Sequence, residues 1–556
     1  MIALRTLLPP TPRCPSLVAL ALPVCLVTTS PLWAQAVAGV GADARPLPAG
    51  AVRIGIAGDW SGYDRRLDAG RSVPVLGALN VPALGTSALP QLAGAQDAVR
   101  RLSGLSSFSL SLGPLESSGD IRRSATPIAV DLGLTSRLAL SVVIPYVESR
   151  NTALLILNRD GTGATVGQNP AYSSTLGTAA RAVNGALLRQ LTDAAAALSA
   201  AVIRCAAPTA LNCDAIRANP TGVQTLLTRA AQAQTDVATL YGSATRGGAP
   251  VVPISGSATQ TAVNAQLASL RSAFVGFGIT GVAESWLPAP ATVINGPGAI
   301  ERIAKDSAYG LAYATLGGTR RAGIGDIDLM MSWLWFNQLG TAPRDWLGAK
   351  ALGVRSVLGA GWRFGTAGAD WTNDALDVPV GDGANALLIR STTDVVFSQR
   401  LWISATVRAV QPLRDQMAMR RPLLSDPALF APSAVGLADR TLGRHLDLEV
   451  APRFAFNSYF GLSAGYQYRR READRYQFAA DSSAAAATLG TPSRSMHQVM
   501  VGLTFSTLAS YLQQQSRWPV EVLFQHLETV GGQGGLVPVV SGDRIELRIY
   551  TGFPRS

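Results

Sequence analysis

The chain has 556 residues, of which 47% are hydrophobic and 15% are charged, and its formal net charge at pH 7 is +11. The basic residues are scattered and nearly all are arginine, so the positive balance does not predict nucleic acid as a partner. Beyond the N-terminal region no run of 18 apolar residues occurs, which argues against a helical membrane protein.

The N-terminus has the pattern of a cleaved export signal. Arg5 and Arg13 supply positive charge, the run 17–27 is apolar, and residues 34–36 form a small-x-small cleavage site. The apolar run is too short to span a membrane as a helix. We therefore expect residues 1–36 to be removed on export.

The cysteines divide between this leader and one later pair. Cys14 and Cys25 lie in the leader, which leaves Cys205 and Cys213 in the exported chain. An isolated close pair in an exported protein predicts a local disulfide. A lipoprotein anchor at Cys25 is the alternative to an ordinary secretory signal, although the two residues before it are not the small ones that such an anchor prefers.

Twelve segments alternate apolar and polar side chains, as β-strands with two different faces do. In one of them Leu446 and Leu448 share a face, and Asp447 and Glu449 share the other. The segments are 52–62, 121–134, 137–148, 324–336, 350–365, 386–397, 400–411, 444–457, 460–471, 495–507, 517–529 and 541–553.

The connections between these segments alternate between short and long. Bacterial membrane barrels have this arrangement and use an even number of strands. A thirteenth candidate at 105–113 would break the alternation, so we assign it to a long external loop or to a strand extension. The sequence thus predicts an all-β, up-and-down antiparallel membrane barrel of about twelve strands, with the first strands and first external loop in 37–148 and the others in 324–556.

The long gap at 149–323 carries a different pattern. Apolar residues recur at helical spacing in 176–204, 221–241 and 258–275, and alanine, a strong helix former, is abundant. A connection of this length is normally functional or a small domain of its own. We expect a helical, disulfide-stapled insertion on the extracellular side.

A soluble sandwich is the main alternative to a membrane barrel, because its strands alternate in the same way. Aromatic residues such as Trp60, Trp333 and Tyr466 lie on the apolar faces near strand ends, as in an interfacial girdle. The polar faces carry charges of both signs, which suit a wet lumen and not a dry core. The pore-lining candidates are Arg355, Arg363, Arg390, Asp394, Arg408, Asp447, Glu449, Arg453, Arg469, Glu546 and Arg548.

Three short motifs in these strands resemble one outer-membrane family. They lie at 131–147 in a hairpin, at 323–329 where a strand opens, and at 450–454 before a tight turn. The family is named for the meta-cleavage pathway of phenol degradation, and its members are regarded as transporters. The resemblance implies a barrel that moves small solutes, and the helical insertion departs from the family pattern.

The sequence predicts no catalytic residue, cofactor or metal site. His445, His497 and His526 fall on separate strands, and no zinc motif is present. Asp326 and Asp328 are interpreted as lumen residues rather than cation ligands. His497 has Ser495 two residues away on the lipid-facing side, which keeps an outer-membrane hydrolase open as a lesser alternative.

The function predicted is therefore a passive channel or transporter for small solutes, aromatic or anionic, in a Gram-negative-type outer membrane. Its expected partners are outer-membrane lipid and the barrel-assembly machinery. A surface adhesion or structural barrel, whose helical insertion binds a partner, is the alternative. None of these hypotheses involves nucleic acid.

Overall fold

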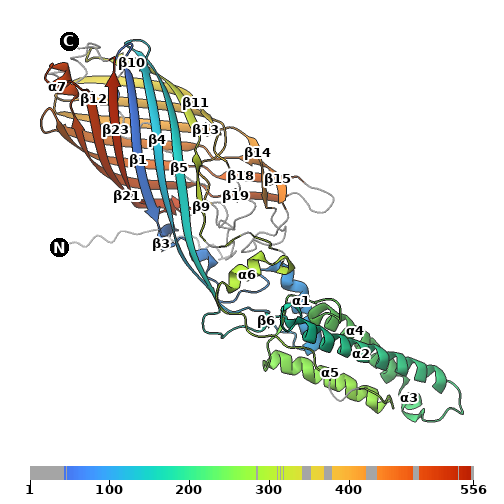
Figure 1. The fold of residues 1–556 in the computed structure, drawn as a ribbon. Coiled ribbons are helices and arrows are strands. Elements are labelled where there is room, and N and C mark those ends of the chain that lie inside the picture. The colour runs from blue at the N-terminus through green and yellow to red at the C-terminus, as the bar shows by residue number, and fades with distance from the viewer. Residues whose placement is uncertain are drawn as a thin grey trace, which may run out of the picture.

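The computed structural model describes residues 43–45, 47–282, 286–309, 311–313, 315–316, 318–340, 352–368, 378–420, 435–479, 487–535 and 537–552. Twelve antiparallel strands form a closed barrel (Figure 1). The barrel strands are β1 (Val52–Tyr63), β4 (Leu115–Gly133), β5 (Leu138–Leu157), β10 (Ile327–Asn337), β11 (Gly353–Phe364), β12 (Ala386–Val396), β13 (Leu401–Pro412), β16 (His445–Ala455), β17 (Phe460–Arg471), β20 (Arg494–Ser506), β21 (Val520–Gly534) and β23 (Ser541–Thr551).

The barrel closes because each of these strands pairs with two neighbours. β1 pairs with both β23 and β4, and β10 pairs with both β5 and β11. All twelve predicted segments correspond to barrel strands, and the up-and-down order is confirmed. The predicted leader, residues 1–36, lies outside the described residues and stays a prediction.

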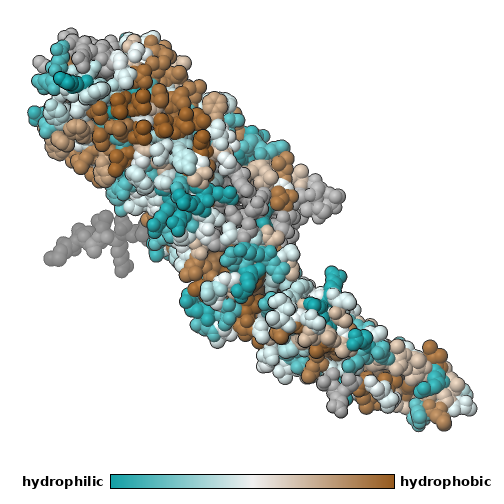
Figure 2. Space-filling view, in the orientation of Figure 1, coloured by the Kyte–Doolittle hydropathy of each residue, from teal (hydrophilic) through white to brown (hydrophobic). Residues whose placement is uncertain are grey.

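The outer surface of the barrel is apolar around its circumference. Figure 2 shows these side chains as a band over the barrel strands, with hydrophilic side chains nearer the helical end. Such a continuous exposed band is incompatible with water and suits the hydrocarbon of a membrane. Exposed members from all twelve strands include Ile54, Ile56, Ile128, Val130, Ile144, Met331, Leu358, Ile389, Val407, Leu448, Val450, Leu462, Val499, Val501, Phe524, Ile545 and Leu547.

The two ends of the barrel differ in their connections. Tight turns at 134–137, 397–400 and 456–459 lie at one end, called here the short-turn end. The opposite end, the long-loop end, carries the extended connections. The segment 105–113 lies in one of these and forms only isolated bridges, so its assignment to a loop is confirmed.

A helical body lies beyond the long-loop end, carried by extensions of β4 and β5 (Figure 1). β5 continues to Leu157, past the predicted start of the insertion at residue 149, because its ladder with β4 continues outside the apolar band. The helices are α1 (Ala93–Ser103), α2 (Gly177–Cys205), α3 (Asp214–Ala218), α4 (Pro220–Tyr241), α5 (Ala258–Gly276) and α6 (Ala299–Lys305).

The three predicted helices are therefore confirmed as α2, α4 and α5, and the disulfide between Cys205 and Cys213 is present. α1 was not predicted. It comes from the first long loop but shares one apolar core with the insertion. By length and composition α2 is apolar enough to cross a membrane, yet its Leu187, Leu191 and Leu198 are buried in that core.

Small sheets and short helices order the remaining loops. They were not predicted, because their strands are too short for a periodic signal. One sheet consists of β14 (Asp415–Arg420), β15 (Val435–Thr441), β18 (Asp474–Phe478) and β19 (Ala487–Thr491), another of β22 (Val537–Pro538), β2 (Arg65–Asp68) and β3 (Arg71–Pro74), and a third of β6 (Val166–Gln168) and β7 (Val251–Pro253). Two further strands, β8 (Gly296–Pro297) and β9 (Arg320–Ile324), pair with β5. The short helices are η1 (Gly77–Leu79), η2 (Pro90–Leu92), η3 (Pro170–Tyr172) and η4 (Ser307–Tyr309), of the 3-10 type, and α7 (Leu508–Leu512) at the short-turn end.

Candidate functional site

The inward faces of the barrel strands form a lumen rich in charged side chains. Because strand side chains alternate, the residues between the lipid-facing positions point inside. All eleven predicted pore-lining residues lie on this inner face, and most are nearly inaccessible, as illustrated by Asp394 and Glu449 at 0% and 3% exposure. Their role in lining a conducting pore stays a prediction.

Ion pairs link many of these charges across neighbouring strands. Arg363 on β11 donates from Nε and Nη2 to the two carboxylate oxygens of Asp328 on β10, at 2.7 and 2.8 Å. Arg355 pairs with Asp394 on β12 at 2.8 Å. The two parallel bonds of Arg363 fix its guanidinium in place, and the pairing with Asp394 holds Arg355 against the wall as well.

Two more pairs join neighbouring strands, Arg408 with Glu449 at 2.7 Å and Arg469 with Asp447 at 3.5 Å. Arg548 pairs with Glu546 on its own strand, β23, at 2.7 Å. An opposite charge nearby lowers the cost of burying each of these groups. Arg390 differs, because it donates to the hydroxyl of Ser332 at 3.1 Å.

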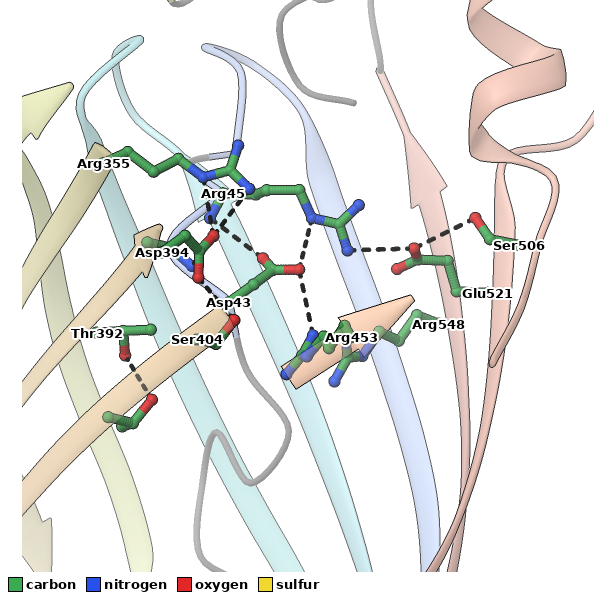
Figure 3. Close-up of polar contacts among 12 residues, drawn as sticks. Asp43, Arg45, Arg355, Thr392, Asp394, Ser404, Arg453, Ser506, Glu521 and Arg548 are labelled. Atoms are coloured by element: carbon green, nitrogen blue, oxygen red, sulfur yellow. Dashed lines mark hydrogen bonds and ion pairs between the residues drawn. The ribbon is translucent and has the colours of Figure 1, made fainter. Parts of the chain in front are cut away.

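The segment before β1 lies inside the barrel at its short-turn end, which the sequence did not predict. Figure 3 shows Asp43 and Arg45 among the wall charges. The backbone N–H of Ala44 donates to Asp394 at 3.0 Å, and Arg45 pairs with Glu521 of β21 at 3.4 Å. The sequence gives little indication of this position inside the barrel, since two opposite charges in a short irregular segment are common on any protein surface.

The Asp43 carboxylate lies among arginines. It contacts the Arg45 guanidinium at 2.6 Å and that of Arg453 at 3.6 Å. Burial alone would raise the pKa of the Asp43 carboxyl, but the charges of Arg45, Arg453, Arg355 and Arg548 lower it below its ordinary value. Asp43 is therefore ionised at neutral pH.

Two cavities lie beside this segment. The smaller, of about 120 Å³, is lined by charged residues such as Arg53 and Asp131 and by apolar residues such as Val143 and Met330. The larger, of about 650 Å³, lies at the short-turn end. Arg45 and Arg548 line both, so the lumen contains space on either side of them.

Asp326 and Asp328 have structural partners, in agreement with their interpretation as lumen residues. Asp326 accepts bonds from the backbone N–H groups of Ala367, Asp382 and Gly383 at 3.0, 3.0 and 3.3 Å. Asp328 is held by an arginine, as described above. Both carboxylates are thus used in organising the long-loop end.

The three histidines lie apart. His497 Nδ1 lies 2.5 Å from the Tyr466 hydroxyl on the outer face, and Nδ1 of His526 lies 2.8 Å from Asp543. His445 stands at the long-loop end of β16. Over the residues that the structure describes, no three potential metal ligands of the histidine, cysteine or carboxylate type come together.

No protein-family model matches the chain, and no curated protein matches its sequence. Among solved structures, an outer membrane channel from Pseudomonas putida F1 is similar at a TM-score of 0.40 and 8% identity, over 92% of this chain and 98% of that one. The monoaromatic hydrocarbon channel CymD aligns at 0.26 and 9%, over 91% and 88%. A Pseudomonas aeruginosa FadL homologue aligns at 0.26 and 6%, over 90% of each. These TM-scores and identities are too low to show a function for this chain.

Proposed function

We propose that the chain is an outer-membrane channel that lets small solutes pass through its lumen. The observation that carries the proposal is a charged lumen containing two cavities, enclosed by a wall with an apolar outer face. Short turns at one end and long loops at the other are the arrangement of outer-membrane barrels, with the short turns in the periplasm. We therefore place the helical body outside the cell.

Conductance across planar lipid bilayers tests this proposal. The purified chain should give discrete conductance steps, and Arg390→Gln should lower the preference for anions over cations, since Arg390 lines the smaller cavity. Arg229→Gln is the matched control, because Arg229 is exposed on α4 in the helical body. Absence of conductance from both the native chain and an Asp43→Asn variant would contradict a channel.

We also propose membership of the outer-membrane family named for the meta-cleavage pathway of phenol degradation. The support is the position of the three motifs: 131–147 spans the turn between β4 and β5, 323–329 leads into β10, and 450–454 lies before the turn at 456–459. Uptake of labelled phenol by cells that produce the chain, compared with cells that lack it, tests the substrate that this family name suggests. Equal uptake by the two would count against it.

A second candidate function is a surface barrel whose helical body binds a partner. The observation in its favour is the disulfide-stapled tip, where Ile203 and Leu211 are 78% and 82% exposed. Surface binding that is abolished by Ile203→Ser with Leu211→Ser, in a barrel that does not conduct, would favour this candidate. Unchanged binding would dismiss it.

A further inference from the structure

Three arginines from distant strands converge at the short-turn end of the lumen. Arg355 is on β11, Arg453 on β16 and Arg548 on β23. Each is within three residues of the end of its strand nearest the short turns, so all three lie at one level of the barrel. Guanidinium groups recognise carboxylates through paired N–H donors, which makes such a convergence suitable for an organic acid.

A carboxylate already lies among these arginines, and it belongs to the chain itself. Asp43 pairs with Arg453 at 3.6 Å, and its side chain is 5% exposed (Figure 3). Asp43 is not part of a barrel strand. The carboxylate is therefore supplied by a segment that the barrel wall does not need for its own strand pairing.

The larger cavity provides room for a molecule beside the same arginines. All three line it, together with the apolar side chains of Leu512 and Leu523. Its volume of about 650 Å³ is within the range of small-molecule sites, roughly 300–1,000 Å³. The cavity therefore offers both positive charge and apolar contact.

Trp402 adds a polar group to this cavity. Its side chain lies on the inner face of β13 and lines the cavity. Its indole N–H is buried and has no hydrogen-bond partner among the residues that the structure describes. A buried donor of this kind favours an acceptor, such as a second carboxylate oxygen, in the cavity.

We propose that these groups form a binding site for small monocarboxylates with an apolar tail, in which Asp43 acts as a self-ligand that the solute replaces. The proposal rests on the channel function and names its solute class. Replacing one carboxylate by another keeps the charge of the cluster balanced, so the exchange avoids leaving arginines uncompensated. Because Asp43 is attached to the chain, it competes at an effective concentration in the millimolar range.

Binding of benzoate to the purified full chain in detergent, measured by isothermal titration calorimetry, tests the site. We expect Asp43→Asn to bind benzoate at least about tenfold more tightly than the native chain, because an attached competitor is removed. Adding Arg453→Gln to Asp43→Asn should abolish that gain. Benzamide, a neutral molecule of the same shape, should bind neither form.

Two results would overturn the site: equal benzoate affinity of the native chain and Asp43→Asn, or benzamide binding as strongly as benzoate. Asp43→Ala serves as a second variant, and a heat-modifiable gel shift verifies that each barrel is folded. Conductance is read separately. A chain that conducts but gives either of these two results would refute the site alone, whereas a chain that binds benzoate as expected and never conducts would support the site and refute the channel.

Discussion

The barrel and the helical body distribute the same residue types in opposite ways. Leu448 and Val450 of the barrel point outward and the charged Glu449 points inward, whereas Leu198 and Phe274 of the helical body are fully buried. The cause is the solvent on each side. Lipid accepts apolar surface and the barrel interior holds the charges, but water around the helical body drives its leucines into a core.

The largest expected effect is in the helical core. Leu198→Ala should destabilise the helical body by about 3 kcal/mol, because it removes a buried side chain and leaves a cavity. Thermal unfolding followed by the helical circular dichroism signal measures this. Leu211→Ala is the matched control at an 82% exposed position and should change little. Equal effects of the two would break the contrast between core and surface.

The second prediction makes the same comparison in the barrel, where the apolar side chains face outward and the polar ones inward. Leu448→Lys places a charge in the apolar band and should cost about 2 kcal/mol of barrel stability. Gln467→Lys is its control on the neighbouring strand, where the register places position 467 opposite Glu449 inside the lumen. Urea unfolding in lipid vesicles compares the two variants. A larger loss for Gln467→Lys would contradict the assignment of the two faces.

The third prediction, of similar size to the second, concerns the disulfide, which belongs to the helical body alone. Replacing Cys205 and Cys213 by serine opens a loop whose ends are eight residues apart, and should lower the stability of the helical body by about 2 kcal/mol. The heat-modifiable gel shift of the barrel should stay unchanged. A barrel that also loses this shift would mean that the two regions unfold together.

Most of the barrel was predictable because its signals are local. Period-two alternation gives the strands, and the lengths of the connections give their number and direction, since only an even count fits alternating short and long links. Helical spacing in the insertion gave α2, α4 and α5 for the same reason. The eleven candidate lumen residues follow from parity alone once one face is assigned to lipid.

What escaped prediction depends on contacts between distant positions. The bond from Ala44 to Asp394 joins residues 350 apart, and no local pattern in residues 43–45 indicates that they lie inside the barrel. α1 joins the core of the helical body only because β4 and β5 extend far enough to bring the first loop beside the insertion.

The sequence by itself therefore determined the strands, their order and the polarity of each face. Those properties are set by side-chain alternation and by the surrounding solvent, which act on each segment separately. The tertiary structure alone decided which charges meet. Closing the barrel brings Arg355, Arg453 and Arg548 to one level, and there Asp43 gains Arg453 as a partner in addition to its chain neighbour Arg45.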